Sequence, residues 1–226
     1  MHTKTVKDFQ SFVRSEVTPA IADLEKLDDK HRIHVQKLVY TNLVDRFDTM
    51  VDSTILDNCR EESLVDEATK DLTSAITESD MVRLLLHGDS LQEALNTKLK
   101  NALRNSVLRQ RHSRKLSTLF KVMKPELNCW SLPRVNPATG EILEQIKPPN
   151  KQQPLSICGY ADWLYSRRNS IVHGAGTNKF LENDAAQLKK LFNCTSANTI
   201  KIKLSSVSNA AAFYLGATQV LLGNDA

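Results

Sequence analysis

The sequence predicts a mostly α-helical fold, a helical bundle with an inserted proline-rich loop and one short strand or hairpin. Apolar residues recur at spacings of three and four through most of the first 120 residues, which is the period of an amphipathic helix. Six of the seven prolines lie between positions 125 and 154, a region in which a long helix is therefore excluded. Helical spacing resumes after Pro154. We expect one domain over residues 1–226, with residues 125–154 as a loop insertion within it.

The first two predicted helices follow directly from this periodicity. The first contains Val6 to Val17, and Pro19 either interrupts it or lies in the first turn of a following helix. The second covers most of residues 31–56, where apolar positions continue over several turns. These positions are Val35, Leu38, Val39, Leu43, Val44, Phe47, Met50 and Val51.

Shorter helices are expected next along the chain. One covers residues 65–76, and another begins at Ser79. Ser90, with Glu93 three positions later, forms a capping box for a helix that begins at Leu91. We expect this helix to continue through a basic stretch toward Lys124.

The second half of the chain changes character. A turn at residues 136–140 predicts a short hairpin within the proline-rich loop. Residues 155–174 return to helical spacing, and residues 184–192 predict another helix. Residues 199–204 alternate between apolar and polar and predict a short strand. A buried helix rich in small residues is expected to end the fold.

The composition is that of an ordinary globular protein, with 41% hydrophobic and 25% charged residues. Aromatic residues make up only 6%, so we expect aliphatic side chains to fill the core. The four cysteines form no Cys-x-x-Cys motif, which favours buried, reduced thiols in a cytoplasmic protein. No run of eighteen apolar residues exists, so no transmembrane helix is expected, and the N-terminus resembles no signal peptide. A membrane is not among the partners that we predict.

Charge is distributed unevenly along the chain. Residues 1–93 contain 11 Lys and Arg against 19 Asp and Glu, whereas residues 94–226 contain 19 against 7. Residues 98–124 contain nine basic residues and no acidic one. Three interpretations are open for this stretch: a solvated helix face, a nucleic-acid contact, or a membrane surface. The RNA-contact candidates are Lys98, Lys100, Arg104, Arg109, Arg111, Arg114 and Lys115, with Arg167 further along the chain.

The segment YSRRNSIVHG holds the most distinctive polar residues. In a helix, Tyr165, Asn169 and His173 lie one above the other because they are four residues apart. Arg168 lies on the neighbouring row with Leu164 and Val172, where a core residue is expected.

The position of Arg168 leaves two interpretations open. Burying an arginine costs several kcal/mol unless it is paired or faces a wet cleft. In the first interpretation, Arg168 belongs to a functional site or a subunit interface. In the second, Arg168 is paired with an aspartate, and the helix ends with His173 and stops at Gly174. Arg167 faces a different direction, which is consistent with plain surface.

The residues Arg168-Asn169, three further residues and then His173 resemble the signature of the HEPN superfamily. In that family an arginine, a following polar residue and a histidine lie on a helix in the later part of an α-helical domain. The form RN-x-I-x-HG is similar to the RiboL-PSP and related HEPN branches. The branch that pairs with nucleotidyltransferase antitoxins has a tyrosine two positions after the histidine, where this chain has Ala175, so that pairing is not implied.

The resemblance implies a metal-independent endoribonuclease that acts as a homodimer, with the motifs of both subunits lining one cleft. His173 is then the acid or base, Arg168 the phosphate clamp and Asn169 the positioning residue. The ribose 2′-hydroxyl is the nucleophile and leaves a 2′,3′-cyclic phosphate. Neither a metal nor another cofactor is implied.

Relatives of this kind often serve as toxins or antiphage-defence effectors, so an antitoxin or other regulatory partner is also implied. Two alternatives remain at this point. One is a non-catalytic HEPN module that binds RNA, a nucleotide or a partner protein. The other is a helical DNA-binding or scaffold protein that acts through its basic helix.

Overall fold

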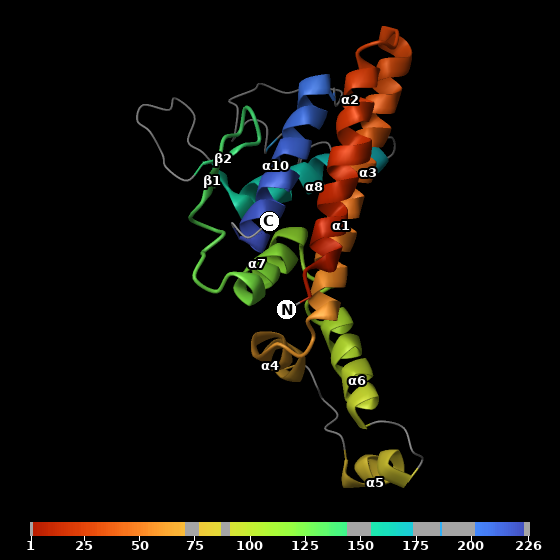
Figure 1. Cartoon of the computed structure of the whole chain (residues 1–226), viewed down its shortest axis with the longest axis vertical. Coiled ribbons are helices and arrows are strands. Elements are labelled where there is room, and N and C mark those ends of the chain that lie inside the picture. The colour runs from red at the N-terminus through yellow and green to blue at the C-terminus, as the bar shows by residue number, and fades with distance from the viewer. Residues whose placement is uncertain are drawn as a thin grey trace.

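The computed structural model describes residues 2–70, 77–86, 91–143, 155–173, 186 and 202–223. The fold is mostly α-helical with a small antiparallel sheet, as the sequence predicts (Figure 1). The helical elements with given bounds are α1 (Lys4–Phe12), the π-helical turn η1 (Val13–Val17), α2 (Thr18–Leu24), α3 (Asp29–Asp57), α4 (Glu62–Lys70), α5 (Glu78–Leu86), α6 (Leu91–Asn105), α7 (His112–Met123), α8 (Ile157–His173) and α10 (Leu204–Leu222). The long helix α3 is central, since α1, α2, α7, α8 and α10 all pack against it.

The N-terminal helices run past Pro19 without a break. Of the two predicted placements, Pro19 takes the one in the first turn of α2. The π-helical turn η1 joins α1 to α2, and the Thr18 hydroxyl donates to the Val13 carbonyl at 3.0 Å. The chain then turns back into α3, whose first turn is capped by Asp28.

Helix α3 follows the predicted apolar stripe with one exception. Leu43, Val44, Phe47 and Val51 are fully buried, but Leu38 is 55% exposed. A helix of this length extends beyond the partners that cover it, so its first turns carry apolar residues that no described element buries.

The core contains more aromatic rings than the composition suggested. The rings of Phe47 and Tyr214 stack with centroids 4.2 Å apart, and Phe9 meets both of them edge-on. Tyr160 and Phe213 extend the group, with centroids 4.8 Å apart. Most buried hydrophobic residues are aliphatic, as expected, and the few aromatic residues are concentrated where α1, α3, α8 and α10 meet.

The predicted basic helix toward Lys124 is two helices. Helix α6 ends at Asn105 and α7 begins at His112, so residues 106–111 form a turn. Val107 in this turn is 1% exposed and packs into the core, which redirects the chain. Figure 1 shows α5 at the far end of α6, away from the helices around α3. The predicted cap at Ser90 lies outside the described residues.

The small sheet confirms the predicted hairpin and adds a strand. Strand β1 (Arg134–Val135) pairs antiparallel with both β2 (Ile142–Leu143) and β3 (Leu155–Ser156), in the order β2-β1-β3. The sequence did not reveal β3. The strand predicted at residues 199–204 is not observed where the structure describes it: Ile202 and Lys203 are irregular, and Leu204 begins α10. Residues 199–201 lie outside the described residues. So does the helix predicted at 184–192, apart from Ala186.

Gly140 closes the hairpin in a conformation that requires glycine. Its φ is +78°, and a Cβ atom there would lie 2.0 Å from the carbonyl oxygen of Asn209. We expect Gly140→Ala to lower the free energy of unfolding by about 2 kcal/mol or more. Urea denaturation measures the change. Gly216→Ala is the control. Its Cβ meets only the Ile142 side chain, at 3.2 Å, and no positive φ strains it, so the loss of stability should be smaller than for Gly140→Ala. Equal losses would contradict the prediction.

Among the described residues, no helix is both long and apolar enough to cross a membrane.

Candidate functional site

The predicted motif residues Arg168, Asn169 and His173 all lie on helix α8. It begins directly after β3, where the Ser156 hydroxyl accepts the Gly159 N–H at 3.1 Å, and it remains helical to His173. Asn169 is half-buried, whereas His173 is exposed in the last turn.

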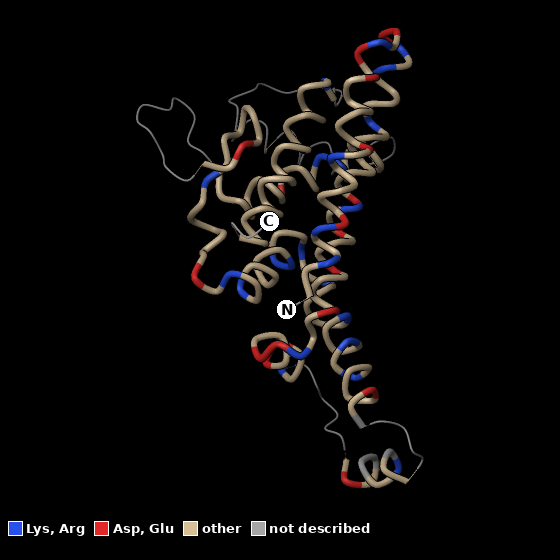
Figure 2. The backbone as a smooth tube through the Cα atoms, in the orientation of Figure 1, with Lys and Arg blue, Asp and Glu red and all other residues tan. Residues whose placement is uncertain are grey.

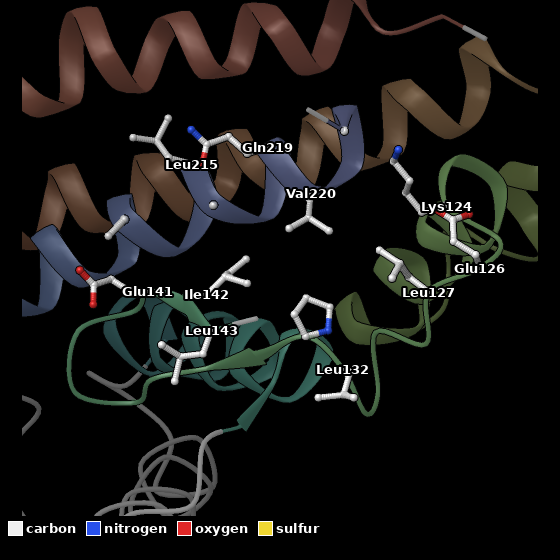
Figure 3. Close-up of a pocket in the computed structure, with 14 residues that line it drawn as sticks. Lys124, Glu126, Leu127, Leu132, Glu141, Ile142, Leu143, Leu215, Gln219 and Val220 are labelled. Atoms are coloured by element: carbon white, nitrogen blue, oxygen red, sulfur yellow. The ribbon is translucent and has the colours of Figure 1, made fainter. Parts of the chain in front are cut away.

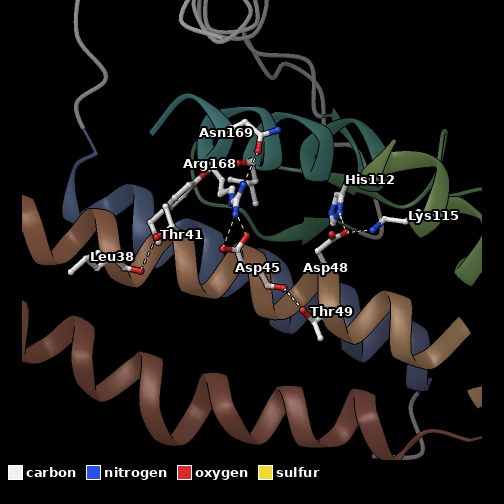
Figure 4. Close-up of polar contacts among 11 residues, drawn as sticks. Leu38, Thr41, Asp45, Asp48, Thr49, His112, Lys115, Arg168 and Asn169 are labelled. Atoms are coloured by element: carbon white, nitrogen blue, oxygen red, sulfur yellow. Dashed lines mark hydrogen bonds and ion pairs between the residues drawn. The ribbon is translucent and has the colours of Figure 1, made fainter. Parts of the chain in front are cut away.

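Arg168 is held by an aspartate of α3, as Figure 4 shows. Its Nε lies 2.6 Å from Oδ1 of Asp45, and its Nη2 donates to Oδ2 of the same carboxylate at 3.0 Å. Nη1 donates to Oδ1 of Asn169 at 3.0 Å. The Arg168 side chain is 21% exposed. The guanidinium is thus held in a half-buried position by an ion pair and one hydrogen bond to a carboxylate on another helix.

Arg167 does not lie on the surface, contrary to expectation. The residue is 8% exposed, and its guanidinium carbon lies 5.6 Å from the centre of the Trp163 ring. A cation over an indole face is stabilised by the ring quadrupole. Direct RNA contact by Arg167 does not fit this buried position.

A second polar cluster lies one turn further along α3. The carboxylate of Asp48 is 2.6 Å from Nδ1 of His112 and 2.6 Å from Nζ of Lys115, and Lys115 also lies 2.7 Å from Asp52 (Figure 4). The side chains of His112 and Lys115 are only 1% and 6% exposed. The predicted RNA contact through Lys115 is therefore wrong, because its ammonium group is buried against two carboxylates.

This acidic–basic cluster shifts the pKa values of its members in different directions. Burial alone would raise the pKa of Asp48, but the bonds from His112 and Lys115 outweigh it and lower the pKa. Burial raises the pKa of Asp52, with Lys115 opposing the change. For Lys115, the bonds to Asp48 and Asp52 outweigh burial and raise the pKa. The ion pair of Asp48 with Lys115 is consequently stable over the neutral range.

Tyr165 connects the two clusters. Its ring stacks parallel on that of His112, with centroids 4.8 Å apart. Burial, followed by the nearby Asp48 carboxylate, raises the pKa of the Tyr165 hydroxyl. Because Tyr165 is four residues before Asn169, the cluster around Asp48 helps to fix the rotation of the helix that carries Arg168.

The remaining basic candidates lie on α6, on α7 and in the turn between them. Arg104, Arg109, Arg111 and Arg114 are exposed, whereas Lys98 and Lys100 are half-buried. Figure 2 shows the basic positions along α6 and α7. The exposed four, named here the α6–α7 basic surface, are accessible to a polyanion.

Sequence reasoning did not identify the acidic partners. Asp45, Asp48 and Asp52 are three and four residues apart and therefore share one face of α3, the face that meets α7 and α8. That spacing was the available signal. No group of three or more potential metal-ligating side chains is found among the described residues.

A large groove lies apart from these clusters. It has a volume of about 1020 Å³ and lies between the β1–β2 hairpin, the segment after α7, and α10 (Figure 3). Its walls are mostly apolar, with Leu127, Leu132 and Leu143 on one side and Leu215 and Val220 of α10 on the other.

Comparison with known proteins gave no match to a protein-family model, a curated protein or a solved structure. A functional assignment therefore depends on the geometry of α8 and the residues around it.

Proposed function

We propose that the chain is a metal-independent endoribonuclease of HEPN type. The observation that carries the proposal is the placement of Arg168: a guanidinium fixed by Asp45, with Asn169 as its immediate neighbour, on a helix whose last turn presents His173. A fixed cation and an accessible imidazole are the two groups that RNA cleavage without a metal requires.

Each residue of the motif has a chemical role in this proposal. His173 accepts the proton of the ribose 2′-hydroxyl, or donates one to the departing 5′-oxygen. The 2′-oxygen attacks the adjacent phosphorus, the P–O5′ bond breaks, and a 2′,3′-cyclic phosphate and a 5′-hydroxyl remain. Arg168 stabilises the additional negative charge on the phosphorane, and Asn169 orients the guanidinium to which it is bonded.

The contacts of Arg168 leave it able to bind a phosphate. Each terminal nitrogen of a guanidinium carries two N–H groups. Among the described residues, Asn169 accepts one from Nη1 and Asp45 accepts one from Nη2, and in this proposal the second N–H of each terminal nitrogen meets a phosphate oxygen. Asp45 thereby orients the donor pair, while its negative charge reduces the general attraction for anions.

Exposed apolar residues near Arg168 support a homodimer with a composite site. Leu38 is 55% exposed and lies two turns before Asp45 on α3 (Figure 4). Val172 is 46% exposed and lies one turn after Arg168 on α8. These two exposed apolar side chains thus lie on the two helices, α3 and α8, that the Asp45–Arg168 ion pair joins. A second copy packed there supplies a second His173, so that one histidine acts as base and the other as acid.

The α6–α7 basic surface provides RNA affinity in this proposal. Contacts from Arg and Lys to phosphates are independent of sequence and weaken as salt is added. By resemblance, the enzyme is a cytoplasmic toxin or antiphage-defence effector held in check by an antitoxin or other regulatory partner.

A cleavage assay tests the proposal. Purified protein is incubated with end-labelled single-stranded RNA in EDTA, and products are resolved on a denaturing gel. We expect cleavage without added metal, and we expect it to continue after prolonged chelation. Cleavage that appears only when a divalent cation is added would contradict the proposed mechanism.

A non-catalytic HEPN module that binds RNA, a nucleotide or a partner protein is the second candidate. The ion pair between Asp45 and Arg168 favours it, since a neutralised arginine is also what a purely structural pair looks like. The two candidates differ in their use of His173. Salt-dependent RNA binding without any cleavage, unchanged in His173→Ala, supports the binding module.

A further inference from the structure

Two thiols lie in contact at the start of α8. Cys129 belongs to the segment between α7 and β1 and is 3% exposed, and Cys158 is the second residue of α8 and fully buried. The Cys158 thiol donates to Sγ of Cys129 with the sulfurs 3.1 Å apart, and both cysteines are reduced. Neither takes part in the proposed RNA chemistry.

The backbone already holds this pair at a distance suited to a covalent bond. The Cys158 N–H donates to the Cys129 carbonyl oxygen at 3.2 Å, so the two main chains are in direct contact. A disulfide requires a sulfur separation of about 2.05 Å. The sulfurs therefore need to approach by only about 1 Å, which small side-chain rotations provide.

The two thiols are chemically unequal. The hydrogen bond from Cys158 outweighs burial and, with help from Ser117, lowers the pKa of Cys129 to about 7. The same contact and burial raise the pKa of Cys158. Cys129 therefore carries the nucleophilic thiolate, and Cys158 is suited to resolve an oxidised neighbour.

A small oxidant has a short route to Cys129. Asn128 and Trp130, its neighbours in the chain, are both exposed, and Trp130 is held by a hydrogen bond of 2.9 Å from its Nε1 to the Ser117 hydroxyl. The Cys129 sulfur therefore lies directly beneath two exposed positions of the chain.

We propose that Cys129 and Cys158 form a redox-modification site whose oxidant is a hydroperoxide. The Cys129 thiolate attacks a peroxide oxygen, the O–O bond breaks, and Cys129 becomes a sulfenic acid. Sγ of Cys158 then attacks the sulfenic sulfur, the S–S bond forms, and the departing hydroxide takes the Cys158 proton and leaves as water. With hydrogen peroxide, two thiols lose two electrons and two protons, and the peroxide is reduced to two waters.

The disulfide links the segment after α7, which forms part of the groove of Figure 3, to helix α8. The segment after α7 contributes Leu127 and Leu132 to the apolar groove of Figure 3, and Cys158 lies ten residues before Arg168 on α8. The cross-link spans 29 residues. Closing a loop of that length restricts the unfolded chain, so the oxidised form should melt at a temperature higher by on the order of 5–10 °C.

Oxidation of the intact protein tests this proposal. Folded protein is treated with hydrogen peroxide, remaining thiols are alkylated, and the digest is analysed by mass spectrometry. We expect a peptide that links Cys129 to Cys158, a loss of two hydrogen atoms in the intact mass, a higher Tm, and reversal by dithiothreitol. Two unmodified thiols, or sulfinic acids without a cross-link, would overturn the proposal.

Two variants separate the roles of the thiols. In Cys158→Ser the same treatment should leave a sulfenic acid on Cys129 that dimedone traps, with no cross-link. Cys59→Ser is the matched control, because Cys59 is also buried and free but lies outside the pair. It should form the Cys129–Cys158 bond as the wild type does, and a cross-link that requires Cys59 would contradict the assignment.

Discussion

His173→Ala is expected to lower the rate of metal-free RNA cleavage by about 10²-fold to 10⁴-fold, the range for loss of a general acid or base. His173 lies in the exposed last turn of α8, so removing its ring leaves no buried cavity and the fold should be retained. The loss should fall on kcat, because the phosphate contacts of Arg168 and the α6–α7 basic surface remain. Single-turnover cleavage of labelled RNA in EDTA measures the rate, and circular dichroism checks the fold.

His34→Ala is the matched control for this substitution. His34 is also an exposed helical histidine, but it lies near the start of α3 and outside the motif. Its cleavage rate should equal that of the wild type. Equal rates for wild type and His173→Ala would remove the imidazole from the mechanism.

Asp48→Ala is expected to cause the largest loss of stability among the substitutions considered. Asp48 balances two nearly inaccessible basic side chains, His112 and Lys115, and the substitution leaves Lys115 with Asp52 alone. Removing one partner of a buried ion pair costs about 3–5 kcal/mol. For a chain of this size the Tm should fall by roughly 10 °C, which urea denaturation and calorimetry can both measure.

The pH dependence of stability gives an independent check on Asp48. Because its folded pKa is lowered from 3.8, its ionised form stabilises the fold above about pH 4, and this contribution disappears as the pH falls below 3.8. The wild type should therefore lose more stability in this acidic range than Asp48→Ala.

Asp57→Ala is the control for Asp48→Ala. Asp57 is an exposed position on the same helix, so its substitution should change the free energy of unfolding by less than about 0.5 kcal/mol. A loss equal to that of Asp48→Ala would contradict the account.

The elements that follow from local periodicity were predictable. The stripe of α3 and the spacing of α8 each bury one face, and the Pro-Ala-Thr-Gly turn places the hairpin. The break between α6 and α7 was not predictable, because residues 98–124 contain no proline or glycine and the turn is set by the burial of Val107. Strand β3 was missed for a similar reason: its two residues gain order only by pairing with β1.

The candidate site was likewise predictable where it depends on local spacing and not where it depends on distant partners. Placement of Arg168 beside Asn169 on one helix follows from spacing alone. Its partner Asp45 is 123 residues away in the chain, and only packing of α3 against α8 brings them together. Lys115 was taken for a surface residue because a run of basic residues normally faces solvent, whereas contacts with Asp48 and Asp52 bury it. Side chains whose burial depends on distant partners cannot be placed from local pattern.

The chemical ends of the RNA products test the central claim most directly. Wild-type protein is incubated with a short RNA of defined sequence in EDTA, and the fragments are identified by mass spectrometry. The account predicts 2′,3′-cyclic phosphate and 5′-hydroxyl ends, formed without any divalent metal. Fragments with 3′-hydroxyl and 5′-phosphate ends, or RNA that stays intact until metal is added, would contradict it.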